Sequence, residues 1–129
     1  MENHILLIDD DEDECLLLQM ALQQCPKPAK VHQVLQFDEA VTFAETFQLT
    51  PNLIFLDLRL PEMPGLEILT WIRNHKRLMD VPVVIWSHTA SDNDLEQIHL
   101  HGGNYFLSKI ADEDSMRQSV KHICDSWLY

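Results

Sequence analysis

The stretch Ile5–Asp11, which reads ILLIDDD, joins an unbroken apolar run to three aspartates. A second apolar run, Leu53–Leu56, leads directly into Asp57. A third, Tyr105–Leu107, is followed closely by Lys109. Short continuous apolar runs between helical patterns predict a parallel sheet that is buried on both faces. Because ligands bind outside the carboxyl ends of such strands, we expect these acids and the lysine to meet at one edge.

Strand and helix patterns alternate five times along the chain. The second strand is the most polar, so we expect it near an edge of the sheet. Strict alternation predicts an α/β fold, a doubly wound parallel sheet with helices on both faces. The expected strands lie at residues 5–8, 31–35, 53–57, 83–87 and 104–108. The expected helices begin near residues 14, 38, 66, 91 and 112, with N-caps at Asp38, Ser91 (in a capping box with Asp94) and Asp112.

The composition narrows the classes of function. At 129 residues with 46% hydrophobic content, the chain is expected to form one globular domain, residues 1–129. Its 21 acidic and nine basic residues give a formal net charge of −12, which repels nucleic acid and anionic lipid. We therefore expect no nucleic-acid partner and no membrane partner.

Cysteine usage and the N-terminus predict the compartment. The three cysteines, Cys15, Cys25 and Cys124, show no CxxC spacing, so reduced thiols fit better than a disulfide framework or a zinc site. Asp9 comes too early for a secretory signal, and no apolar stretch approaches the roughly 20 residues that span a bilayer. We expect a cytoplasmic protein.

The two aspartates that directly follow the first run suit a metal ion. Acidic residues after a strand often only favour the dipole of the next helix, and that accounts for residues 11–14. Asp9 and Asp10 instead stand at the expected crevice, where adjacent carboxylates repel each other unless a cation intervenes. Hard oxygen ligands favour magnesium, so we expect Mg²⁺ at this pair.

Three further side chains complete the expected edge. Asp57 is expected at its solvent-facing rim, where a carboxylate contributes little packing. Lys109, one residue past a strand and facing carboxylates, suits a counter-ion or a phosphate ligand. Ser87 ends the run Val83–Trp86 and places a hydroxyl on the same edge.

Together these segments resemble the receiver domain of two-component response regulators over essentially the whole chain. The resemblance implies a flavodoxin-like (βα)5 fold, with five parallel strands in the order 2-1-3-4-5. It also implies that Asp57 accepts a phosphoryl group from a sensor histidine kinase or a phosphotransfer protein. The matching segments are Ile5–Asp10, Leu53–Pro61, Pro82–Ser87 and Tyr105–Lys109.

The resemblance also implies a role for each site residue. Asp57 is the nucleophile, and Lys109 pairs with the phosphoryl group once it is attached. Closure of the Ser87 hydroxyl onto that group, with rotation of Phe106, couples the phosphate to a changed protein-binding surface. The implied Mg²⁺ ligands are Asp10 directly, Asp9 through water, Asp57, and the main-chain carbonyl of Arg59.

The chain departs from the family pattern at three places. Ile110 stands where a proline usually follows the lysine, so we expect no cis peptide bond there. Pro64 replaces an acidic residue that is common before the loop glycine. His88 directly follows Ser87, where the family keeps a small residue, and we expect its ring to crowd the phosphoryl site. A hydrogen bond from His88 to the phosphoryl group, or a solvated ring, stays open.

Two other functions stay open at this point. A haloacid-dehalogenase-type phosphatase also uses a strand-end aspartate, a lysine and magnesium, although the sequence offers no substrate-binding insertion. The second alternative is a receiver-like adaptor that binds its partner without phosphorylation. The departures from the family pattern at His88 and Ile110 keep this alternative open. No output domain follows the last helix, so we expect a stand-alone regulator that binds a downstream protein and is not an enzyme. The sequence does not identify the kinase or the downstream target, and it does not decide whether the protein forms a homodimer.

Overall fold

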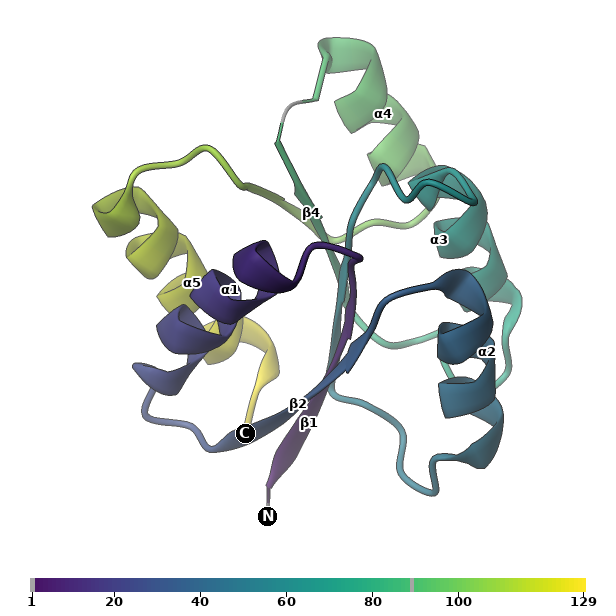
Figure 1. The fold of residues 1–129 in the computed structure, drawn as a ribbon, viewed down its shortest axis with the longest axis horizontal. Helices are drawn as coiled ribbons and strands as arrows, with labels where there is room; N and C mark the ends of the chain where they lie inside the picture. The colour runs from purple at the N-terminus through teal and green to yellow at the C-terminus, as the bar shows by residue number, and fades with distance from the viewer. Residues whose placement is uncertain (1, 89) are drawn as a thin grey trace.

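Within residues 2–88 and 90–129, which the structure describes, five parallel strands form one central sheet (Figure 1). The structure is a computed structural model. Its strand order is β2-β1-β3-β4-β5, which confirms the expected flavodoxin-like topology. The strands are β1 (Asn3–Ile8), β2 (Ala29–Val34), β3 (Leu53–Leu56), β4 (Val83–Ser87) and β5 (Tyr105–Ser108).

The helices in the same ranges cover the two faces of the sheet unequally. Figure 1 shows α1 and α5 together on one face, and α2, α3 and α4 on the other. They are α1 (Glu12–Gln23), α2 (Phe37–Thr46), α3 (Gly65–Asn74), α4 (Asp92–Leu100) and α5 (Glu113–Trp127). The predicted α/β sandwich, with helices on both faces, is therefore confirmed.

The strands bury alternate residues on opposite faces, which creates separate hydrophobic clusters above and below the sheet. In β1, Ile5 and Leu7 pack in the cluster under α1 and α5. Leu6 and Ile8 pack in the cluster under α2, α3 and α4. Trp86, a large and fully buried side chain of β4, lies on the α1 and α5 side. Because both faces are covered, the polar residues that follow the strands emerge at the carboxyl edge.

The start of α2 corrects one prediction. Asp38 is not the N-cap, because the helix begins at Phe37 and its N-cap residue is Gln36. Glu62, from the loop after β3, accepts a hydrogen bond from the Phe37 N–H at 3.0 Å. The free N–H at the start of the helix is thus satisfied by a side chain that is distant in sequence, and not by a neighbouring cap residue.

The other caps agree with their sequence signals. Ser91 and Asp94 form the expected capping box at α4, and Asp112 caps α5 by accepting a hydrogen bond from the Ser115 N–H at 2.8 Å. β2 spans Ala29–Val34, slightly earlier than predicted, and lies at the sheet edge as expected.

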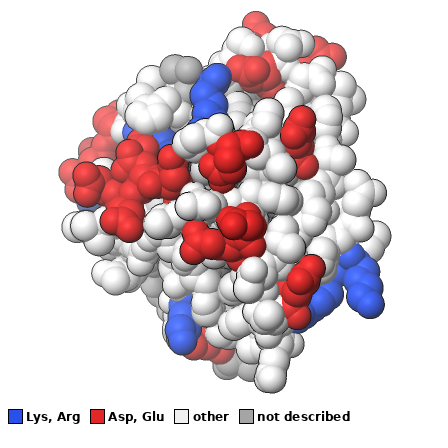
Figure 2. Space-filling model, turned by 45° about the vertical axis from the view of Figure 1, so that its right-hand side comes forward, with Lys and Arg blue, Asp and Glu red and all other residues white. Residues whose placement is uncertain are grey.

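The surface reflects the acidic composition. The face drawn in Figure 2 carries several groups of acidic side chains and few basic ones, in keeping with the formal net charge of −12. In the described part of the chain, no helix is both long enough and apolar enough to cross a bilayer.

Candidate functional site

Parallel pairing of β1 with β3 places two aspartates next to each other at the carboxyl edge. Ile8 pairs with Leu56, and the Asp57 N–H donates to the Ile8 carbonyl at 2.9 Å. Asp9 has an exposed fraction of 0% and Asp57 of 7%. The expectation that Asp57 lies at the solvent-facing rim is therefore wrong, because pairing of the strands carries both carboxylates into the protein.

Lys109 reaches into this pair from the loop after β5. Its Nζ lies 2.7 Å from Asp9 Oδ2, 3.2 Å from Glu14 Oε1 and 3.4 Å from Asp57 Oδ2. The side chain is only 2% exposed, and its Nζ lies 5.5 Å from the ring centroid of Trp86. The lysine is therefore a buried counter-ion in this structure, one of the two roles expected for it.

Each aspartate divides its two oxygens between the main chain and the lysine. Asp9 Oδ1 accepts a hydrogen bond from the Asp11 N–H at 3.0 Å, and Asp57 Oδ1 accepts one from the Arg59 N–H at 3.1 Å. The Oδ2 atoms of both aspartates face Lys109. These bonds hold the two carboxylates in one orientation.

Burial shifts the pKa values of Asp9 and Lys109. Burial raises the pKa of Asp9 above its ordinary value, and the hydrogen bond from Lys109 offsets only part of that cost. Burial acts to lower the pKa of Lys109, but Asp9, Asp57 and Glu14 together outweigh it, so that pKa is raised. The lysine therefore stays protonated, and three carboxylates around one ammonium leave the site negative.

The acidic cluster fits a divalent cation. One carboxylate oxygen from each of Asp9, Asp10 and Asp57 lies within 4.8 Å of the others. Asp10 is exposed, so the cluster is open to solvent on that side. Carboxylate oxygens are the ligands preferred by Mg²⁺ and similar hard cations, and such an ion offsets the charge that Lys109 leaves unbalanced. The cluster is thus able to bind a divalent metal.

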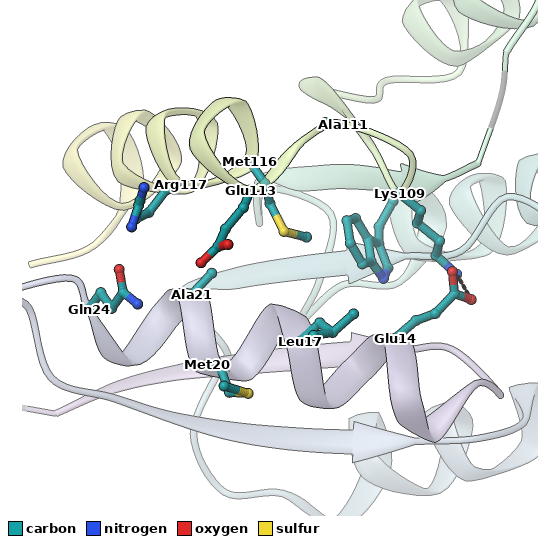
Figure 3. A pocket seen from close by; sticks show the side chains of 11 residues that line it. Glu14, Leu17, Met20, Ala21, Gln24, Lys109, Ala111, Glu113, Met116 and Arg117 are labelled. Atoms are coloured by element: carbon teal, nitrogen blue, oxygen red, sulfur yellow. Dashed lines mark hydrogen bonds and ion pairs between the residues drawn. The ribbon is translucent and has the colours of Figure 1, made fainter.

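Glu14 belongs to this site, although its position near a helix start predicted only an interaction with the helix dipole. Its Oε1 faces Lys109, and its Oε2 lies 2.7 Å from Nε2 of His88. Figure 3 shows Glu14 and Lys109 pointing toward each other at one end of a pocket of about 300 Å³ between α1 and α5. The signal for Glu14 is its place one helical turn after Asp10, since first-turn side chains lean back toward the strand end.

The remaining predicted residues lie around this centre. Ser87 is 2% exposed at the end of β4, and its carbonyl accepts a hydrogen bond from the Lys109 N–H at 2.7 Å. Phe106 is half-buried against the cluster under α2, α3 and α4. His88 is 61% exposed at its side chain and lies against Glu14. In the described ranges no peptide bond is cis, so the bond before Ile110 is trans as expected.

The sheet order and the acid–lysine cluster at its carboxyl edge are the features of a receiver domain. The family model for the "Response regulator receiver domain" matches residues 5–121. The chain belongs to this family.

Several known proteins and solved structures are similar to this chain. The phosphorylated cyanobacterial phytochrome response regulator RcpA is 29% identical, with a TM-score of 0.86, covering 98% of this chain and 94% of that one. The Mn²⁺-bound form of response regulator Rcp1 is 26% identical, with a TM-score of 0.84 and the same coverages. The "Probable methanogenesis regulatory protein FilR2" of Methanothrix harundinacea is 27% identical over 128 residues, 96% of this chain and 83% of that protein. The "Transcriptional regulatory protein KdpE" of Staphylococcus aureus is 29% identical over 124 residues, which are 95% of this chain but only 50% of that protein.

Proposed function

We propose that this chain is a phospho-accepting response regulator in which Asp57 receives a phosphoryl group. The observation that carries the proposal is the position of the Lys109 ammonium, 3.4 Å from Asp57 Oδ2 and 2.7 Å from Asp9 Oδ2. Phosphoryl transfer to a carboxylate needs fixed positive charge beside the phosphoryl oxygens, and a buried lysine supplies it. Membership of the receiver family and the similarity to phosphorylated RcpA support the same chemistry.

The donor in this proposal is a phosphohistidine on a sensor histidine kinase or a phosphotransfer protein. An oxygen of Asp57 forms a bond to phosphorus while the phosphorus–nitrogen bond of the donor breaks. The electron pair of that bond stays on the imidazole nitrogen. The hydrogen bond from the Arg59 N–H keeps the Asp57 carboxylate in one orientation toward the incoming group. Lys109 pairs with the phosphoryl oxygens from the place that it already occupies.

We assign the metal site to the carboxylates of Asp9, Asp10 and Asp57 together with the main-chain carbonyl of Arg59. The closeness of the three carboxylates and the Mn²⁺-bound form of Rcp1 support this assignment. When bound at these residues, Mg²⁺ would supply positive charge beside the phosphoryl oxygens.

The proposed output is a changed surface that a downstream protein recognises. Ser87, buried at the end of β4, offers its hydroxyl to the phosphoryl group, and Phe106 follows by turning within its half-buried site on β5. A local charge is in this way converted into a different packing of neighbouring side chains.

The test is phosphorylation by a small donor such as acetyl phosphate with Mg²⁺, followed at once by intact-mass measurement. The wild type should gain one phosphoryl group, and Asp57→Asn should gain none. Asn is the matched variant, because its amide oxygen still accepts the hydrogen bond from the Arg59 N–H, which an alanine would leave unpaired.

Other outcomes contradict the proposal. Steady donor turnover without a covalent adduct favours the phosphatase. A folded protein that neither gains the group nor turns over the donor, yet binds its partner, favours the phosphorylation-independent adaptor. An unchanged rate of modification in Asp57→Asn removes Asp57 as the acceptor.

A further inference from the structure

Two cysteines that are far apart in the sequence meet where α1 ends beside α5. Cys25 follows shortly after α1, and Cys124 lies in the C-terminal part of α5. The Cys25 thiol donates a hydrogen bond to Cys124 Sγ, with 2.8 Å between the sulfurs. A disulfide has a sulfur–sulfur distance of about 2.05 Å, so the two sulfurs lie only roughly 0.8 Å farther apart than in a bridge.

The surroundings hold both cysteines in place. The Cys25 N–H donates to the Leu22 carbonyl at 3.1 Å, which fixes the thiol to the end of α1. Two residues on, Lys27 Nζ donates to the carbonyls of Cys124 at 3.4 Å and Leu128 at 2.9 Å. The segment after α1 is therefore tied to the end of α5 on the side where the sulfurs face each other.

Of the two cysteines, Cys25 is the more accessible one. Cys124 is fully buried, whereas Cys25 is half-buried and lines a surface hollow of about 460 Å³. Lys27 and Lys30 line the same hollow, alongside Glu2. The chain as a whole has a formal net charge of −12 and repels anions. The two lysines of this hollow give it local positive charge, which attracts a small anionic reagent.

We propose that Cys25 and Cys124 are a thiol oxidation site that forms a reversible disulfide, with a small anionic disulfide such as oxidised glutathione as the oxidant. The Cys25 thiolate attacks one sulfur of oxidised glutathione, the bond between its two sulfurs breaks, and one glutathione leaves as a thiolate. The Cys124 sulfur, once deprotonated, attacks Cys25 Sγ, and the second glutathione leaves as a thiolate that takes up a proton. Two protein thiols are oxidised, and one glutathione disulfide is reduced to two thiols.

The second step should be the slower of the two. Burial, and next the hydrogen bond with Cys25, raise the pKa of Cys124, so little of its thiolate is present at neutral pH. Closure of the bridge should therefore become faster as the pH rises toward that pKa. Cys15 is excluded as the attacking group by geometry, because its buried Sγ donates to the Asp9 carbonyl at 3.9 Å, whereas Cys124 Sγ faces Cys25.

Oxidation would link two helices that border the functional site. The bridge joins residues 99 positions apart and links the end of α1 to α5. These two helices flank the pocket that adjoins Lys109. A crosslink over so long a loop restricts the unfolded chain strongly, so the melting temperature of the oxidised protein should rise by about 10 °C.

The experiment exposes the reduced full chain to oxidised glutathione at about pH 8.5, near the ordinary pKa of a thiol. The protein is then denatured without reductant, its free thiols are alkylated, and its mass and peptides are measured. The wild type should keep one free thiol, Cys15, and yield a peptide pair linked through Cys25 and Cys124. The reductant dithiothreitol should reverse both the link and the rise in melting temperature.

Three variants make the result decisive. Cys124→Ser should retain one glutathione on Cys25, and Cys25→Ser should keep both of its thiols free. Cys15→Ala, the matched control, should form the bridge as the wild type does. Three free thiols in the oxidised wild type, or a disulfide in Cys25→Ser that forms as fast as in the wild type, would overturn the proposal.

Discussion

Glu14 binds His88 across the mouth of the site, with 2.7 Å between Oε2 and Nε2. The other oxygen of the same carboxylate lies 3.2 Å from Lys109 Nζ. The imidazole is thus held against α1, an arrangement that the sequence alone did not suggest. That His88 crowds the phosphoryl site stays a prediction, and Glu14 is a second residue able to slow the arrival of an anion.

The first prediction concerns this carboxylate. Glu14→Gln removes a negative charge beside Lys109, so phosphorylation by a small anionic donor should become about 3- to 10-fold faster, or about 0.7–1.4 kcal/mol lower in barrier. The measurement is the initial rate of phosphorylation in saturating Mg²⁺.

Glu12→Gln is the matched control, since it changes the same charge at an exposed position of the same helix turn. A rate for Glu14→Gln no higher than that of Glu12→Gln would contradict the prediction. If His88→Ala alone raises the rate as much as Glu14→Gln, crowding by the ring is the better account.

Lys109 should contribute to stability as well as to chemistry. Lys109→Met leaves Asp9 and Asp57 without a cation, and breaking a buried ion pair from one side costs about 3 kcal/mol. Urea unfolding in metal-free buffer should show that loss, and added Mg²⁺ should restore part of it. Lys121→Met, at an exposed position of α5, serves as the control. A loss below about 1 kcal/mol would show that the pair is not a net stabiliser.

Asp10 should control the metal affinity. Asp10→Asn removes one of three clustered carboxylates, so the Kd for Mg²⁺ should rise at least about 10-fold. With less repulsion among the acids, the melting temperature in metal-free buffer should rise by about 2–4 °C. Asp13→Asn, also exposed but outside the cluster, should change neither value much. An unchanged magnesium titration for Asp10→Asn would exclude Asp10 from the site.

Gly65 should position the loop that carries Arg59. A Cβ added at Gly65 would lie 2.6 Å from both the Cα and the carbonyl oxygen of Leu58, and backbone atoms cannot yield as a side chain can. Gly65→Ala should therefore lower the free energy of unfolding by about 1–3 kcal/mol and weaken magnesium binding. Glu67→Ala, exposed in the same helix turn, should have little effect. Equal stability of the two variants in urea unfolding would disprove the close packing.

Asp112 should give a pH-dependent contribution at the start of α5. Hydrogen bonds from the Ser115 N–H, and then from its hydroxyl, hold the pKa of Asp112 below its ordinary 3.8. Because the pKa of Asp112 is lower in the folded state, its charge stabilises the folded protein above pH 3.8. This stabilisation is lost as the pH falls through the pKa of Asp112 in the folded protein. Asp112→Asn keeps a neutral cap, so its stability deficit against the wild type should shrink between about pH 6 and pH 3. A deficit that stays constant over this range in thermal unfolding would rule the charge out as its cause.

The predictable parts of the fold are those that local patterns specify. The apolar runs of β1, β3 and β4 and the caps at Ser91 and Asp112 were all recognised, because each signal lies within a few residues. The cap of α2 was missed because Glu62, far along the chain, bonds the Phe37 N–H. Glu14 was misread because an acid in the first turn suits the helix dipole whether or not a lysine faces it.

The pattern of residues by itself determined the strand–helix alternation and the meeting of Asp9, Asp57 and Lys109 at one edge, whereas the sheet order was expected only from the resemblance to receiver domains. It could do so because parallel strands deliver their carboxyl ends to the same side. Only the tertiary structure decided that Asp57 is buried, that His88 is held by Glu14, and that Cys25 faces Cys124. The physical reason is that burial, and contacts between side chains of different elements, depend on how helices pack on the sheet, and no spacing within a single segment encodes that packing.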